Sequence, residues 1–353
     1  MRPRSFTSDF LDYRAPPWLP GGNLQTIWPA LFGRRTRGPV PAYRRHRLTT
    51  PDGDFVDLDY LANDVSQQRP LIVLFHGLEG SSRSHYSEAF ADVAWRGKLT
   101  YVVPHFRSCS GEMNLAPRAY HSGDYEEIGW MLERIREMHK GPIVAVGVSL
   151  GGNALLRWAG EMGESASKVV SAVASVCSPL DLAAGGHAID RGFNRMVYAA
   201  MFLRALKPKA KVKWSQHPGL FDIDALMQAR GIYEFDHIFT APVHGFTSVE
   251  DYWEKASAKP HLPRIRIPAL ALNARNDPFI PAASLPTQAE AGDWVTLWQP
   301  AHGGHVGFPA GGPPGHVLAM PEAVTAWLLQ ASGITPRVPQ AWPAAPMTVP
   351  AAL

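Results

Sequence analysis

The residue best suited to nucleophilic chemistry in this chain is Ser149, the centre of the pentapeptide Gly-Val-Ser-Leu-Gly at 147–151. A G-x-S-x-G pattern is typical of a sharp strand-to-helix turn, because small residues on either side of the serine let neighbouring backbone approach closely. The helix that follows such a turn directs backbone N–H groups toward developing negative charge. The apolar run 143–146 precedes the pattern and a helical pattern, 151–162, follows it. This placement favours Ser149 as a nucleophile over a mere tight turn.

A nucleophilic serine needs a histidine base and a carboxylate that orients the base, in the chain order serine, acid, histidine for this type of turn. Two downstream segments, Asn-Asp-Pro at 276–278 and His-Gly-Gly-His at 302–305, each follow a predicted strand. We therefore predict Asp277 as the acid and His305 as the base, because two preceding glycines leave the His305 loop free to turn the ring inward. His302 remains an alternative base.

Asp181 is the alternative acid. It ends the segment Ser-Pro-Leu-Asp at 178–181, which matches a helix start with Ser178 as N-cap, a proline at the first helical position and an acidic residue at the third. That structural role is sufficient to explain Asp181. The alternative interpretation of Asp277 is a turn-forming aspartate before proline.

Two backbone N–H groups are needed to bind the oxyanion that forms during acyl transfer. We predict that they belong to Leu150, directly after the serine, and Leu78, just past the apolar run 71–75. The nearby His76 is expected to hold this loop by hydrogen bonds, and Glu79 to pair with an arginine. We predict no cofactor and no metal, because the remaining histidines lack a matching pattern of ligands.

The composition describes a globular enzyme, with 46% hydrophobic and 18% charged residues among 353 and a net charge of +3. Such a charge predicts no nucleic-acid partner. Cys109 and Cys177, the two cysteines, are too few for a disulfide scaffold and are expected to be buried spectators. No apolar stretch approaches ~18 residues and residues 1–20 lack a signal-peptide pattern, so we expect no transmembrane segment and a cytoplasmic protein.

Strand and helix patterns alternate along the chain, which predicts a mostly parallel sheet with helices on both faces. An α-rich insertion between two halves of the sheet predicts a helical cap. The predicted strands are 55–60, 71–75, 101–103, 143–146, 169–176, 269–272 and 295–298, and the predicted helices include 84–95, one after Asp124 with Glu127 as a capping-box partner, 151–162, 193–206, 223–229 and 321–330. The predicted division is an N-terminal segment with Trp-Leu and Leu-Gln-Thr motifs (1–54), the first half of the core (55–180), the cap (181–260), the second half of the core (261–331) and a Pro/Ala-rich tail (332–353).

One stretch of the predicted cap combines apolar side chains with a following group of four lysines. The simpler interpretation is a helix packed on the core with a solvated basic end. The alternative is a lid that contacts anionic membranes peripherally. The residues are Met196, Val197, Met201, Phe202 and Leu203, then Lys207, Lys209, Lys211 and Lys213.

From about residue 16 to 330 the chain resembles the YheT-like branch of the α/β-hydrolases, which includes the ABHD1/ABHD3-type lipases. The resemblance rests on Pro17-Trp18-Leu19, Leu24-Gln25-Thr26, His76 to Ser82, Phe106-Arg107, Cys109-Ser110-Gly111, Tyr120-His121-Ser122-Gly123, Gly147 to Asn153, Asn276-Asp277-Pro278 and Gly303-Gly304-His305. It implies the α/β-hydrolase fold and a Ser149–Asp277–His305 triad, and it favours His305 over His302. The family usually has Gly at the position of Ser108 and often His at that of Asn23.

The resemblance implies a carboxylic ester hydrolase, since relatives act on short- and medium-chain acyl esters and some on acylglycerols or phospholipids. We expect a serine carboxylesterase that forms an acyl-enzyme on a small-molecule or lipid ester. The alternatives are a lipase, phospholipase or acyltransferase for longer acyl chains and, third, a non-catalytic binding module.

Overall fold

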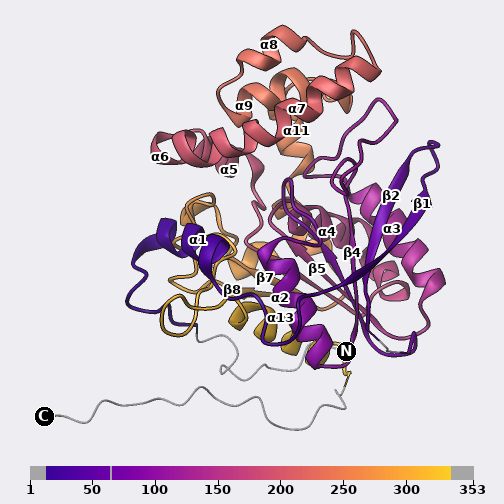
Figure 1. The fold of residues 1–353 in the computed structure, drawn as a ribbon, viewed down its shortest axis with the longest axis vertical. Helices are drawn as coiled ribbons and strands as arrows, with labels where there is room; N and C mark the ends of the chain where they lie inside the picture. The colour runs from indigo at the N-terminus through magenta and orange to yellow at the C-terminus, as the bar shows by residue number, and fades with distance from the viewer. Residues whose placement is uncertain (1–12, 64–65, 335–353) are drawn as a thin grey trace, which may run out of the picture.

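Eight strands form a single sheet in the computed structural model, which describes residues 13–63 and 66–334 (Figure 1). Their order is β1-β2-β4-β3-β5-β6-β7-β8. β2 pairs antiparallel with β1 and β4, and every other neighbouring pair is parallel. The strands are β1 (Tyr43–Thr49), β2 (Phe55–Leu61), β3 (Leu71–Phe75), β4 (Thr100–Pro104), β5 (Ile143–Val148), β6 (Ala172–Val176), β7 (Ala269–Leu272) and β8 (Val295–Trp298).

Helices cover both faces of the sheet, so its central strands are buried along their whole length. Successive side chains of β3 point to opposite faces: Leu71 and Val73 join one core cluster, whereas Ile72 and Leu74 join the other. The first cluster includes residues of α3 (Tyr125–Met138) and α4 (Leu150–Met162), and the second includes residues of α2 (His85–Arg96) and α13 (Ala319–Ala331). This arrangement confirms the predicted fold class.

β1 is the strand that sequence reasoning missed. Its residues, Tyr-Arg-Arg-His-Arg-Leu-Thr, are mostly exposed and show no apolar alternation. Arginine–carboxylate pairs attach it to β2: Arg45 contacts Asp59 and Arg47 contacts Asp57, both at 2.8 Å. Residues 1–50 contain nine arginines and two aspartates, and two of these arginines therefore have a structural use at the edge of the sheet.

Between β6 and β7 the described chain forms helices and loops without a strand. These helices gather at one end of the sheet (Figure 1). We refer to them as the helical insertion; the predicted domain limits, 181–260 for the cap, stay a prediction. Its elements are α5 (Leu182–Ile189), α6 (Gly192–Asn194), the π-helical η3 (Arg195–Ala199), α7 (Ala200–Gln216), α8 (Ile223–Gln228), α9 (Ile232–Phe235), the π-helical η4 (Asp236–Thr240), α10 (Ala241–Val243) and α11 (Val249–Ala256).

Two predicted helix starts differ in the structure. Asp124 precedes α3, but its side chain and that of Glu127 bind arginines, so the predicted capping box is wrong. Asp181 is itself the N-cap of α5 and accepts the N–H of Ala184, whereas Ser178 was predicted as the cap. Asp181 therefore has a structural role, as expected, but as the N-cap itself. The cap lies three residues further along the chain than predicted.

The N-terminal segment contains a helix for which no pattern was predicted, α1 (Gly21–Phe32), beside the loops that follow β7 and β8. Its buried face consists of Gln25, Thr26 and Pro29. The shorter elements are η2 (Gly163–Lys168), η5 (Lys259–Arg264), η6 (Ala282–Ser284) and α12 (Gln288–Ala291). Beyond position 334 the predicted tail lies outside the described residues. Within the described ranges, no helix has both the length and the apolar character required to cross a membrane.

Candidate active site

Ser149 occupies a strained turn between β5 and α4. Its φ is +52°, a left-handed conformation that non-glycine residues rarely adopt. The flanking glycines explain the motif: a Cβ at Gly147 would lie 2.4 Å from the Gly151 carbonyl oxygen, and one at Gly151 would lie 2.5 Å from that of His76. Only glycine fits at either position, so the sequence folds into a turn that holds the serine hydroxyl out from the end of β5.

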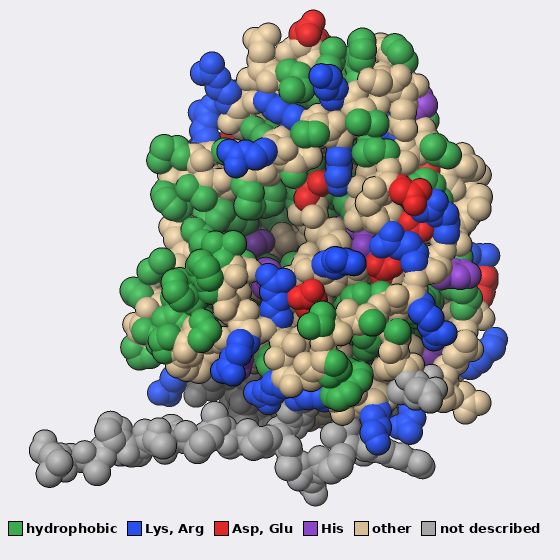
Figure 2. Space-filling view, viewed as in Figure 1, with side chains coloured by type: hydrophobic (Ala, Val, Ile, Leu, Met, Phe, Trp, Pro, Cys, Tyr) green, Lys and Arg blue, Asp and Glu red, His purple; other side chains and the backbone are tan. Residues whose placement is uncertain are grey.

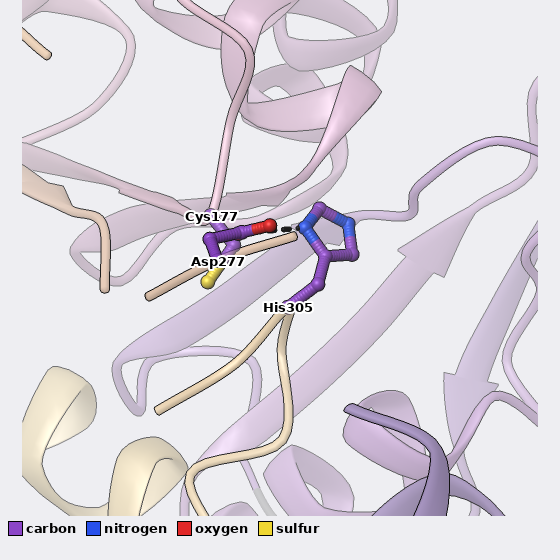
Figure 3. Close-up of side chains that lie close together, drawn as sticks. All are labelled: Cys177, Asp277 and His305. Atoms are coloured by element: carbon purple, nitrogen blue, oxygen red, sulfur yellow. Dashed lines mark hydrogen bonds and ion pairs between the residues drawn. The ribbon is translucent and has the colours of Figure 1, made fainter. Parts of the chain in front are cut away.

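The structure brings Ser149, Asp277 and His305 into one hydrogen-bonded chain. The Nε2 atom of His305 lies 3.1 Å from Ser149 Oγ. The Nδ1 atom of His305 lies 2.8 Å from Asp277 Oδ2, the contact drawn as a dashed line in Figure 3. Asp277 is buried, and its other oxygen accepts the Phe279 N–H at 2.8 Å. Because the carboxylate accepts the Nδ1 proton, Nε2 is left to accept the serine proton.

The two alternative residues lie elsewhere. His302 is exposed, and its Nδ1 is 3.4 Å from the Asn276 side-chain nitrogen. Asp181 caps α5 and contacts the backbone of that helix. Of the candidates, Asp277 and His305, which the sequence favoured, are therefore the ones that lie next to Ser149 in the structure.

The predicted oxyanion-binding residues, Leu78 and Leu150, line a cavity together with Ser149. Leu150 is the first residue of α4, so its N–H belongs to the positive end of the helix dipole. Leu78 follows Gly77, where a Cβ would lie 3.2 Å from that of Ser149. Both backbone segments thus pass close to Ser149.

The loop around Leu78 is held by its neighbours. His76 Nε2 accepts the Phe106 N–H at 3.1 Å, so Nδ1 donates to the Gly77 carbonyl at 2.8 Å. Burial lowers the pKa of His76 to about 3, which keeps the ring neutral in this role. The predicted loop-holding function of His76 is therefore confirmed.

Glu79, which adopts φ +56°, connects the same loop to the helical insertion. Its Oε2 lies 2.6 Å from Lys209 Nζ on α7, so the expected arginine partner is wrong. The Tyr120 hydroxyl donates to Glu79 Oε1 and accepts the Glu79 N–H, both at 2.9 Å. A charged partner from the insertion and a tyrosine from the core thus fix the residue next to Leu78.

α1 contributes side chains to the site that sequence reasoning did not assign. Gln25 Oε1 accepts hydrogen bonds from the Gly303 N–H and the Asn276 side chain, both at 2.9 Å. Thr26 Oγ1 accepts the N–H of His305 at 2.8 Å. α1 therefore contacts the loops that carry Asp277 and His305. The Leu-Gln-Thr motif was visible in the sequence, but its residue types indicate no partner.

Cys177 lies next to Asp277 and His305 (Figure 3), with one candidate ligand atom from each of the three within 4.8 Å of the others. Its Sγ accepts the Val306 N–H at 3.3 Å and lies 3.7 Å from the Gly304 carbonyl oxygen, so it contacts both neighbours of His305. Burial raises the pKa of the thiol well above its usual range. The atoms of Cys177, Asp277 and His305 that could hold a metal ion already have partners within the protein, since Sγ contacts Val306 and Gly304 while Asp277 Oδ2 and His305 Nδ1 pair with each other. Cys177 is buried as predicted, but it supports the loop rather than being a spectator.

Ser149 and His305 open into an apolar cavity of about 380 Å³ between α1 and the helical insertion. A smaller cavity of about 90 Å³ reaches Ser149 as well and includes Asp236, Tyr252 and Trp253. Both cavities therefore meet at Ser149. The larger cavity is lined by Thr26, Ile27, Ala30, Leu31, Gly77, Leu78, His85, Tyr86, Val148, Ser149, Val197, Tyr198, Met201, Phe202, Phe279, His305 and Val306.

Ser108 and Asn23, the two positions that depart from the family pattern, each have a distinct conformation or contact in the structure. Ser108 adopts φ +64°, a conformation that explains the usual glycine. Asn23 on α1 accepts a hydrogen bond at 2.9 Å from the hydroxyl of Tyr198, which lines the larger cavity. The asparagine thus connects α1 to the helical insertion beside the site.

The sheet and the serine turn define the class of an α/β-hydrolase, and comparison with known proteins agrees. A family model described as "alpha/beta hydrolase fold" matches residues 70–311. "Putative esterase YheT" of Escherichia coli (strain K12) is 40% identical, covering 82% of this chain and 84% of its own, and phospholipase ABHD3 of Mus musculus is 31% identical, covering 80% and 73%. A puromycin-hydrolyzing peptidase of Mycobacterium tuberculosis shares the fold alone, with a TM-score of 0.53 and 19% identity over 84% of this chain and 40% of that one. The chain therefore belongs to the α/β-hydrolase family, in the branch that contains YheT and ABHD3, and is a hydrolase of that family.

Proposed function

We propose that this hydrolase is a serine carboxylesterase that cleaves esters of short- to medium-chain acyl groups through an acyl-enzyme. The observation that carries the proposal is the chain of contacts from Asp277 through His305 to Ser149, at 2.8 and 3.1 Å. Nucleophile, base and orienting acid are thereby within hydrogen-bonding reach, as acyl transfer by a serine requires.

In the proposed mechanism, His305 Nε2 takes the Ser149 proton as Oγ attacks the ester carbonyl, and Asp277 stabilises the imidazolium. The N–H groups of Leu78 and Leu150 bind the resulting oxyanion. Collapse of the tetrahedral intermediate breaks the ester bond, and His305 gives its proton to the departing alcohol. A water molecule, deprotonated by His305, then attacks the acyl-enzyme and releases the acid and free Ser149.

The cavities support the substrate class. At ~30 Å³ for each water-sized group, the larger cavity of about 380 Å³ holds roughly a dozen such groups. Its almost wholly apolar walls suit an acyl chain, and the smaller cavity suits a short second arm. A lipase, phospholipase or acyltransferase for longer chains is the second candidate, favoured by the exposed apolar side chains at the cavity mouth and by the relative named as a phospholipase.

The decisive experiment compares each proposed residue with its rejected alternative. Ser149→Ala should abolish both nitrophenyl butyrate hydrolysis and labelling by a fluorophosphonate probe, while the circular dichroism spectrum stays unchanged. His305→Ala should lower kcat by roughly 10³-fold or more, whereas His302→Ala should retain activity. Asp277→Asn should be strongly impaired, whereas Asp181→Asn should not, since asparagine also caps helices. Labelling of the Ser149→Ala protein at the wild-type rate would refute the proposal, and a nitrophenyl ester series from acetate to palmitate would separate the two substrate classes.

A further inference from the structure

Exposed apolar side chains flank the mouth of the larger cavity on two sides. On α1, Leu24, Leu31 and Phe32 are 46%, 65% and 55% exposed. Across the mouth, where α6 and η3 lead into α7, Phe193, Met196 and Met201 are 47%, 72% and 51% exposed. Figure 2 shows apolar side chains gathered over both regions, with the surface hollowed between them. These six residues, termed here the apolar rim, are six of the eleven large apolar side chains that are exposed in the described chain.

The apolar rim is continuous with the interior. Leu31 and Met201 belong to the rim and also line the cavity that reaches Ser149. An uninterrupted apolar path therefore leads from the surface to the nucleophile. Exposed apolar patches of this kind around a cavity mouth are typical of surfaces that bind a partner rather than of ordinary solvated surface.

The segments that carry the rim are basic and contain no acidic residue. Residues 13–51 contain seven arginines, and residues 191–221 contain seven lysines and arginines, with neither aspartate nor glutamate in either range. The whole chain has a net charge of only +3, so this excess is local. At least six of these fourteen cations pair with carboxylates from elsewhere, namely Arg35, Arg37, Arg45, Arg47, Arg195 and Lys209. Others gather in a shallow surface hollow lined by Arg204, Lys207, Lys211 and Arg230.

The apolar rim and the positive charge around it together favour one kind of binding partner over another. A second copy of the chain would bring the same positive charge to the contact, which opposes association. An anionic lipid surface offers acyl chains to the rim and negative headgroups to the cations, each of which strengthens binding near the membrane. The sequence pattern placed a possible membrane contact in the cap alone; the structure adds α1 as the opposite half of the same surface.

We propose that the apolar rim and its surrounding cations bind the surface of an anionic lipid bilayer. In this arrangement α1 and the start of α7 rest in the interface, and the cavity mouth opens toward the acyl chains. The consequence for substrate supply rests on the proposed esterase function. Binding itself does not require Ser149.

The test uses the full chain with Ser149→Ala, so that vesicles are not hydrolysed, and measures co-sedimentation with phosphatidylglycerol/phosphatidylcholine vesicles at low and high salt. We expect binding that weakens with salt and with loss of phosphatidylglycerol. Adding Phe32→Glu and Met196→Glu, neither of which lines the cavity, should lower the partition coefficient at least tenfold. The matched control adds Val40→Glu and Leu115→Glu, which are 79% and 58% exposed and introduce the same charge at apolar side chains that are not among the six rim residues; it should lose much less.

No binding at low salt would overturn the proposal. Equal losses in the rim and control variants would also overturn it, since the added negative charge, and not the loss of the apolar rim side chains, would then explain the weaker binding. A dimer in solution that dissociates on the rim substitutions would instead assign the surface to a second copy. The rim substitutions are also made in the protein that retains Ser149, and its hydrolysis of soluble nitrophenyl butyrate is measured. This measurement tests the proposed esterase function separately from vesicle binding. Vesicle binding without any esterase activity would leave docking intact and refute the function, and the reverse result would refute docking alone.

Discussion

The Thr26 hydroxyl accepts the backbone N–H of His305 at 2.8 Å, across 279 residues of sequence. His305 stands between Gly304 and Val306, both of which adopt a left-handed backbone with φ near +60°. A β-branched residue rarely adopts this conformation, which costs on the order of 1–3 kcal/mol. The loop keeps this shape because contacts from α1, Asn276 and Cys177 hold it on several sides.

Thr26→Val should reduce turnover without unfolding the protein. The variant keeps the shape of the side chain but leaves the His305 N–H without its acceptor, a loss of about 1–3 kcal/mol. We expect kcat for nitrophenyl butyrate to fall roughly tenfold with little change in KM, because the loss misplaces the base rather than the substrate. Thr26→Ser retains the hydroxyl and should restore most of the activity. A serine variant as impaired as the valine variant would show that Thr26 acts by packing instead.

Breaking the pair of Glu79 and Lys209 should also lower kcat. The 2.6 Å contact holds the residue next to Leu78 in a strained conformation, so its loss loosens the loop that we propose binds the oxyanion. Glu79→Gln and Lys209→Met should each be impaired, and Lys209→Arg should be close to wild type. In a double-mutant cycle the combined variant should be little worse than either single variant, with a coupling of about 1 kcal/mol. Strictly additive effects on kcat would argue against a functional pair.

Filling the larger cavity should shorten the preferred acyl chain. Val197→Trp places a bulky ring in a wall of this cavity, and each buried CH₂ excluded removes about 0.8 kcal/mol, or roughly fourfold in kcat/KM. Activity on decanoate esters should fall steeply while that on acetate esters changes little. Val212→Trp on the exposed side of α7 is the matched control. Equal losses for acetate and decanoate would mean that the acyl chain binds elsewhere.

Asp236 should make stability fall as pH rises. Burial raises the pKa of this carboxyl to about 6, so between pH 4 and 6 the folded state holds a proton that the unfolded state has released. The contribution of Asp236 to the free energy of unfolding should therefore decrease across this window, by at most about 3 kcal/mol, and remain lower above it. Urea unfolding of wild type and Asp236→Asn at pH 4, 5.5 and 7.5 checks this. The free energy of unfolding of wild type minus that of Asp236→Asn should decrease from pH 4 to pH 7.5. A difference that stays constant with pH would contradict the prediction.

Local patterns predicted those parts of the molecule whose causes are local. β3 and β7 match their predicted limits because continuous apolar runs need burial on both faces. The serine turn was predictable because glycine spacing at 147 and 151 is a steric requirement. By contrast, β1 depends on arginines that find carboxylates on the adjacent strand, so its sequence resembles a solvated surface.

The surroundings of the candidate site were less predictable, because their partners are distant in sequence. Gln25 and Thr26 are polar residues on a helix and resemble exposed positions until the loops at Asn276 and His305 pack over them. Glu79 was expected to bind an arginine, and only the placement of α7 identifies Lys209. Residue types indicated which groups have the chemistry, whereas the contacts that orient those groups depended on the tertiary fold.

The hydrogen bond between Gln25 and Asn276, which are 251 residues apart in the sequence, has a consequence for folding during synthesis. During translation α1 is made long before the loops that follow β7 and β8, so Gln25 and Thr26 lack their hydrogen-bond partners until those loops have been synthesised. Asp277 and His305, the acid and base that we propose, lie in the same loops. The proposed site is therefore complete only when the early helix and both late loops are present together.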